Sequence, residues 1–195
     1  MKKHNLIGSI WLITIASALF APAAYSQFHV GIDYRYCLGI REQMIGRELY
    51  IAEYDMHNYY LQLTAIYQIT PQIATGIGIS AGMAEYHKLY TFPVFATVRF
   101  SPIKSHTPLY IFTDLGYTIP CKDKRSMPQG WIWNTGIGYR WMFRKHFGLN
   151  FQLSYFMQQY KGVKTTMYER YTNKSFTLDR NNLRHSLAFT LGLVF

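Results

Sequence analysis

The residues of this chain best suited to chemistry are charged side chains that stand inside otherwise apolar segments. Asp114 lies midway along one such segment, and Arg99 and Arg140 lie in the segments before and after it. A carboxylate between two guanidinium groups would form a buried ion-pair cluster, because removing one partner leaves a costly unpaired charge. We therefore predict a structural cluster. The alternative is a gate or selectivity element for a small pore.

A second candidate group combines Asp33 and Arg35 with Arg184. The first two share one face of an alternating segment near the start of the chain, and Arg184 lies in the last segment. If the first and last segments are neighbours, the three side chains lie close together. The same two roles apply to this group, structural pairing or gating.

His185 and Ser186 could be taken for a base beside a nucleophile. Such a pair works only when the two side chains are within hydrogen-bond reach of each other. Successive residues of a strand point to opposite faces, so these two could not act together. The histidines of the chain also lack the spacing of a metal site. We expect no enzymatic activity and no cofactor.

The chain has two cysteines, Cys37 and Cys121. Two cysteines in an exported protein are compatible with one disulfide, with two free thiols or with an intermolecular contact. The choice depends on their separation in space, which the sequence does not give.

The charged residues named above lie in a set of eight segments that have apolar residues at every second position. Period-two alternation predicts strands, and the segment lengths are near the roughly 9–11 residues with which a tilted strand crosses a bilayer. The predicted strands are Phe28–Leu38, His57–Ile69, Ile73–Ala84, Leu89–Phe100, Leu109–Ile119, Trp131–Phe143, Phe147–Gln158 and Leu183–Phe195.

One face of each predicted strand is strongly apolar, and the other is small or polar. All six formally charged residues inside the strands fall on the less apolar face. Gly76 and Gly78 fall there too, and we interpret them as small residues that make room for larger side chains across the barrel. A soluble barrel would have the opposite arrangement, with large apolar residues inside. The pattern favours lipid outside and a crowded, partly polar lumen.

Three longer connections separate the strands, and we expect them to be solvated outer loops. They span Gly39–Met56, Pro120–Gly130 and Gln159–Asn182, and the first contains the acidic residue Glu42. The remaining connections are mostly short turns. Long loops at one end of the strands and short turns at the other are the asymmetry expected of a transmembrane barrel.

The beginning of the chain has the features of a secretory signal peptide. Lys2 and Lys3 precede the apolar stretch Leu6–Ala21, and small residues follow at Ala24 and Ser26. We predict a signal peptide over residues 1–26 and a barrel domain over residues 27–195.

The formal net charge is +10, or +8 without the two signal lysines. These charges are scattered over the connections and form no basic helix or Lys/Arg run, so nucleic acid is not an expected partner.

The last strand ends on Phe195. An alternating final strand with a terminal Phe resembles the C-terminal assembly signal of bacterial outer-membrane β-barrels. The fold class predicted for the chain is all-β, an eight-stranded antiparallel up-and-down transmembrane β-barrel. With this strand count and polarity, the chain from Gln27 to Phe195 resembles the small outer-membrane barrel family, the OmpA/OmpX-like eight-stranded proteins.

The resemblance implies a place in the bacterial outer membrane, contact with its lipid and lipopolysaccharide, and recognition by the barrel-assembly machinery. It carries across no catalytic residue. We expect a structural or surface-interaction role through the outer loops, with an unknown extracellular partner. A small, porin-like diffusion channel is the alternative, and a lipid-modifying enzyme is a third hypothesis. Outer-membrane lipid A deacylases use a His/Ser pair in an H-x-S-N motif, which the adjacent His185 and Ser186 do not reproduce.

Overall fold

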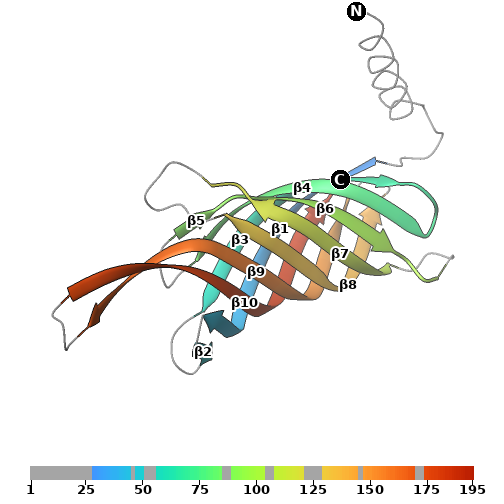
Figure 1. The fold of residues 1–195 in the computed structure, drawn as a ribbon. Helices are drawn as coiled ribbons and strands as arrows, with labels where there is room; N and C mark the ends of the chain where they lie inside the picture. Colours follow the sequence, from blue (N-terminus) through green and yellow to red (C-terminus); the bar gives the residue numbers. More distant parts are fainter. Residues whose placement is uncertain are drawn as a thin grey trace, which may run out of the picture.

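The computed structural model describes residues 28–44, 47–50, 56–84, 89–103, 108–120, 129–144, 147–169 and 174–195. These residues form one antiparallel sheet that closes on itself (Figure 1). Its strands are β1 Phe28–Met44, β2 Arg47–Tyr50, β3 His57–Gln68, β4 Ile73–Ala84, β5 Leu89–Thr91, β6 Pro93–Phe100, β7 Leu109–Thr118, β8 Gly130–Arg144, β9 Phe147–Glu169 and β10 Lys174–Val194.

Eight of these strands form the barrel wall. Each of β1, β3, β4, β6, β7, β8, β9 and β10 pairs with the next along the chain, and β10 pairs with β1 to complete the circle. The short strand β5 precedes β6, from which Phe92 separates it, and β2 pairs with the end of β1. Closure gives every wall strand two neighbours, which a sheet within hydrocarbon requires because no water is present to satisfy an open edge. The prediction of an eight-stranded antiparallel up-and-down transmembrane barrel is confirmed.

The two ends of the barrel differ. The turn end holds Phe28, Phe195 and the short connection between β3 and β4, whereas the loop end holds the far ends of β1, β9 and β10 (Figure 1). In the part of the chain that the structure describes, no helix is long and apolar enough to cross a membrane.

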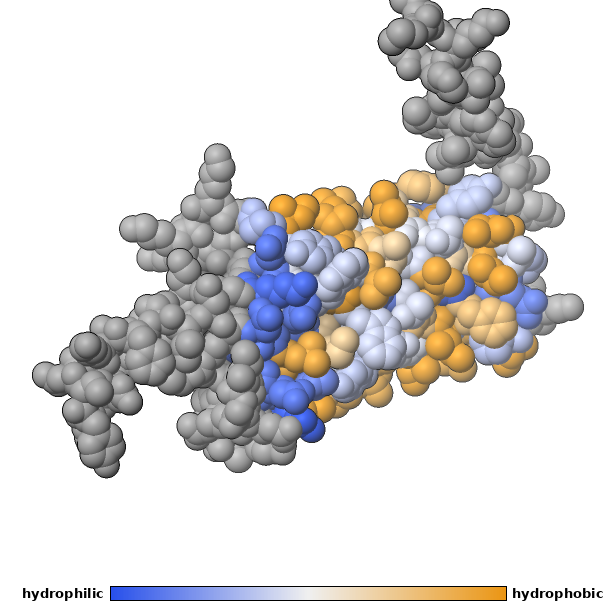
Figure 2. All heavy atoms as spheres, in the orientation of Figure 1, coloured by the Kyte–Doolittle hydropathy of each residue, from blue (hydrophilic) through white to orange (hydrophobic). Residues whose placement is uncertain are grey.

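The barrel wall is apolar on its outside. Buried and exposed residues alternate without interruption from Pro93 to Phe100, and the exposed ones are Val94, Ala96, Val98 and Phe100. Figure 2 shows hydrophobic residues spread over the wall and a band of hydrophilic ones next to the loop end. Because lipid tails do not solvate polar groups, this polarity suits a barrel that is surrounded by a bilayer.

Aromatic rings gather on the outside at both ends of the wall. At the turn end Trp141, Phe143, Phe147 and Phe195 form a continuous row with ring centroids 4.9, 6.1 and 5.6 Å apart. At the loop end the ring pairs are Tyr36–Tyr59 and Tyr117–Trp131, at 5.5 and 5.3 Å. Two belts of this kind mark the levels of the two membrane–water interfaces.

Three strands are much longer than the sequence predicts. β1 continues to Met44 instead of ending at Leu38, and β9 and β10 continue as a paired arm to Glu169 and Lys174. In β1 the register shifts between Gly39 and Arg41, so Ile40 is an extra residue that reverses the alternation. The arm lies beyond the apolar wall, where no lipid imposes an apolar face. The connections predicted as solvated loops are therefore partly strand.

Glycines on the lumenal face make room for aromatic rings. A Cβ at Gly78 would lie 2.3 Å from a ring carbon of Phe95, and one at Gly82 would lie 2.3 Å from the ring of Tyr60. The predicted role of Gly78 is confirmed. At Gly76 the crowding atoms belong instead to the backbone of Ala65 and Ile66.

We predict that Gly78→Ala lowers the free energy of unfolding by about 1–3 kcal/mol, because the Phe95 ring must leave its position. Ala81→Val on the exposed face of the same strand is the control, with an expected change within about 0.5 kcal/mol. Urea unfolding of the refolded protein, followed by tryptophan fluorescence, measures both. Equal changes for the two variants would contradict this packing.

Candidate functional site

The candidate site is the lumen of the barrel, where the structure places every charged residue predicted there. Five of the six side chains are buried and Arg140 is partly exposed at the turn end. The six residues are Asp33, Arg35, Arg99, Asp114, Arg140 and Arg184.

An ion pair crosses the middle of the lumen from wall to wall. Arg35 Nη2 donates to Asp114 Oδ2 at 3.2 Å, and the two residues lie on β1 and β7, which are opposite each other in the ring of eight strands. Asn134 Nδ2 donates to the same carboxylate oxygen at 2.7 Å. The sequence-based grouping of Asp114 with Arg99 and Arg140 is wrong. The ion-pair partner of Asp114 comes from the opposite wall of the barrel and not from the adjacent strands.

A second ion pair lies in the lumen near the loop end, between the neighbouring strands β1 and β10. Arg184 Nε and Nη2 donate to Glu42 Oε2 at 2.8 and 2.6 Å, and Arg184 Nη1 donates to Asn58 Oδ1 at 2.9 Å. Asn182 Nδ2 donates to the other carboxylate oxygen of Glu42 at 2.9 Å. Glu42 lies in a segment that was predicted to be a solvated loop, so this pair was not predicted. Asp33 and Arg35 interact electrostatically as expected, but the prediction that Arg184 joins them is wrong. The bulge at Ile40 brings Glu42 into the lumen.

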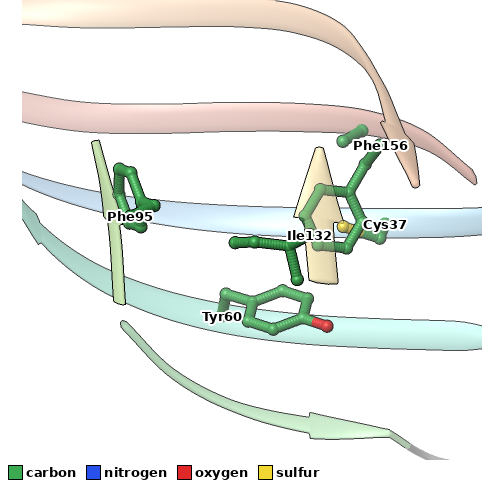
Figure 3. Packing of buried hydrophobic residues seen from close by; sticks show 6 residues of the cluster. Cys37, Tyr60, Phe95, Ile132 and Phe156 are labelled. Atoms are coloured by element: carbon green, nitrogen blue, oxygen red, sulfur yellow. The ribbon is translucent and has the colours of Figure 1, made fainter. Parts of the chain in front are cut away.

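A layer of apolar side chains fills the lumen between these two ion pairs. Figure 3 shows rings and aliphatic groups from different strands converging on the axis. The Tyr60 and Phe156 rings meet edge to face with centroids 5.5 Å apart, although β3 and β9 are three strands apart in the wall. The layer consists of Cys37, Tyr60, Phe95, Ile132, Phe156 and Ala188.

Polar contacts join the apolar layer to the charged groups on both sides. The Arg35 guanidinium carbon lies 5.4 Å from the centroid of the Phe156 ring. On the other side, Tyr60 Oη donates to Gln158 Oε1 at 2.5 Å, and Tyr160 Oη donates to the same oxygen at 3.0 Å. Cation–π contacts and shared acceptors of this kind hold buried groups in one arrangement. The middle of the lumen is therefore a packed core.

A third polar group occupies the lumen toward the turn end. Asn150 Nδ2 donates to Asp33 Oδ1 at 2.8 Å, and Asn150 Oδ1 accepts from Tyr110 Oη. The ring of Tyr110 contacts the guanidinium groups of Arg99 and Arg140, at 5.0 and 5.7 Å from its centroid. Unlike Arg35 and Arg184, these two arginines make no ion pair within 4.0 Å among the described residues.

His185 and Ser186 lie on opposite faces, as alternation predicts. Ser186 is buried on the lumenal face, whereas the imidazole of His185 contacts the phenol of Tyr155 outside the lumen. The described residues also contain no group of three or more His, Cys, Asp or Glu that could hold a metal ion.

Cys37 is buried in the apolar layer and forms no disulfide with the described residues. Cys121, its partner in the disulfide that the sequence allows, lies outside the described residues. The three alternatives for these cysteines therefore stay as the sequence leaves them.

No protein-family profile matches this chain, and no curated protein matches it in sequence. Among solved structures it is similar to the outer membrane protein OprG from Pseudomonas aeruginosa, with 9% identity, a TM-score of 0.45, and coverage of 86% of this chain and 94% of that one. It is also similar to the outer membrane protein AlkL in DMPC lipid bilayers, with 13% identity, a TM-score of 0.49, and coverage of 90% and 93%. It is similar as well to Neisserial surface protein A, with 11% identity, a TM-score of 0.46, and coverage of 85% of this chain and 96% of that one.

At these identities the likeness concerns the fold alone. The chain's own residues define its architecture, because closure leaves no unpaired edge in the wall, the outside is apolar and the charges face inward. This is the architecture of a small integral outer-membrane β-barrel of bacteria.

Proposed function

We propose that the protein is a non-enzymatic outer-membrane barrel whose interior is structural and whose interactions with other molecules take place at the loop end. The observation that carries this proposal is the Arg35–Asp114 ion pair, which joins opposite walls of the barrel at 3.2 Å. An eight-stranded barrel has an interior just wide enough to be filled by side chains. A bridge of this kind, with an apolar layer beside it, leaves no continuous aqueous path through the middle.

The arm formed by β9 and β10 supports a role in surface interaction. β9 pairs with β8 only as far as Gln158, and β10 pairs with β1 only as far as Leu183. One further backbone hydrogen bond joins Lys161 N to Gln129 O at 2.9 Å, and beyond it the two strands pair with each other and project from the barrel (Figure 1). A projecting ribbon offers surface to a partner outside the membrane without disturbing the barrel.

Lipid and lipopolysaccharide are the proposed surroundings of the wall, and the barrel-assembly machinery is the proposed partner of the last strand. Phe195 is well placed for such recognition. Its backbone exchanges hydrogen bonds with Val30 at 2.8 and 3.0 Å, and its ring extends the aromatic row at the turn end. Its role as an assembly signal stays a prediction.

Planar-bilayer recording of the refolded protein tests the closed interior, with heat-modifiable gel mobility as proof of folding. We expect a band that shifts on boiling and no discrete conductance steps. Reproducible steps from folded protein would overturn the proposal in favour of a diffusion channel. Mass spectrometry of lipid A after deletion and overexpression tests the absence of enzymatic activity, and we expect an unchanged lipid profile.

A further inference from the structure

A cavity of about 520 Å³ opens at the turn end of the lumen. Its volume falls within the range of roughly 300–1,000 Å³ that is typical of small-molecule pockets. Arg99, Arg140, Gln68 and Ser101 contribute to its polar lining, and none of the described residues that line it is acidic. The cavity is therefore a cationic recess at the level of the aromatic row.

Arg99 is buried in the wall of this cavity and makes no ion pair within 4.0 Å with the described residues. The residue is 4% exposed, and its Nε and Nη1 atoms make no hydrogen bond with the described residues. Arg140 Nε is likewise buried without a hydrogen bond. Buried donors of charged groups are normally satisfied, because an unsatisfied one costs the full loss of hydration. Both residues line the cavity, so a ligand with acceptor oxygens bound there would lie beside this uncompensated charge.

The two arginines are also held close to each other. Both guanidinium groups contact the ring of Tyr110, so two like charges share one face of the cavity. Asp33 interacts electrostatically with Arg99, but its carboxylate is hydrogen-bonded to Asn150. Asp114 is bound to Arg35. An anion in the cavity would relieve the repulsion between the two arginines.

We propose that this cavity binds a phosphate group, carried either by a soluble molecule or by a lipid headgroup. Guanidinium groups bind phosphate through two parallel hydrogen bonds, and two of them converge on one recess. The aromatic row that includes Trp141 places the recess at a membrane–water interface, where lipid phosphates lie. The proposed site lies at the turn end, and the proposal does not depend on the role proposed for the loop end.

Isothermal titration calorimetry on protein refolded in an uncharged, phosphate-free detergent tests this site. One arm titrates inorganic phosphate, and the other titrates short-chain phosphatidylglycerol. Binding in the first arm identifies a soluble phosphate ligand, and binding in the second alone identifies a lipid headgroup. Either result supports the site, whereas no heat of binding in both arms would overturn it.

The variant Arg99→Gln/Arg140→Gln assigns the binding to the cavity. The variant removes both charged donors of the cavity, so the dissociation constant should rise at least tenfold. Lys161→Gln, on β9 near the loop end, removes a positive charge elsewhere and should leave binding unchanged. Heat-modifiable mobility verifies that each variant is folded, and the single variants replace the double one if it does not refold. Equal affinity of folded wild-type and cavity variants would contradict the proposal.

Discussion

Replacing Asp114 by alanine should lower the free energy of unfolding by about 3–5 kcal/mol, the loss typical of breaking a buried ion pair from one side. The substitution removes the ion-pair partner of Arg35 at a position that is 2% exposed, and leaves only the more distant carboxylate of Asp33, which is hydrogen-bonded to Asn150. The described contacts of Arg35 would then be Thr190 Oγ1 at 3.3 Å and the ring of Phe156. Urea unfolding of the refolded protein in lipid vesicles gives the value.

The double variant Arg35→Met/Asp114→Leu separates charge pairing from packing. Replacing a buried pair by apolar residues of similar volume is often neutral or stabilising, so we expect the double variant to recover most of the loss. A gating role makes a different prediction, namely conductance steps in Asp114→Ala at unchanged stability. If Asp114→Ala had the same free energy of unfolding as the wild type, this would contradict the structural role of the pair.

The sequence contained enough to place these charges in the lumen, but not to pair them. Alternation decides which face a residue occupies, and lipid on the outside makes the charged face unambiguous. Pairing depends on how the barrel closes. Arg35 and Asp114 are 79 positions apart and on opposite strands, so their contact follows from the tilt and stagger of the whole barrel. The sequence indicates only which strands are neighbours. Choosing ion-pair partners from neighbouring strands therefore assigned the wrong partners to Asp114.

Glu42 shows a different limit. The alternation that defined β1 ends at Ile40, because the bulge inserts one residue and reverses the faces that follow. Beyond the bulge Glu42 is lumenal and pairs with Arg184 at 2.6 Å. Arg184 in the predicted closing strand was the available signal, since a buried guanidinium requires a carboxylate nearby. The apolar layer was partly predictable, because Gly78 indicated a large side chain close to it, and the ring of Phe95 on the neighbouring strand β6 occupies that space.

Replacing Phe156 by alanine should have the second large effect, a loss of about 3–5 kcal/mol in the free energy of unfolding. Phe156 is 1% exposed and contacts both the Tyr60 ring and the Arg35 guanidinium. Truncation therefore removes the ring on which the ion pair rests and opens a cavity inside the apolar layer. Urea unfolding in vesicles again measures the loss.

Phe151→Ala is the matched control, because it is the same substitution on the same strand but on the exposed face. Acyl chains can fill the space that it leaves, so the loss should be smaller. The two variants should also differ in planar bilayers. If the apolar layer is what prevents conduction, Phe156→Ala combined with Asp114→Ala shows discrete steps, whereas Phe151→Ala stays silent. If the folded Phe156→Ala/Asp114→Ala variant showed no conductance steps, other side chains would have to close the lumen. Equal losses in the free energy of unfolding for Phe156→Ala and Phe151→Ala would refute a packed core around Phe156.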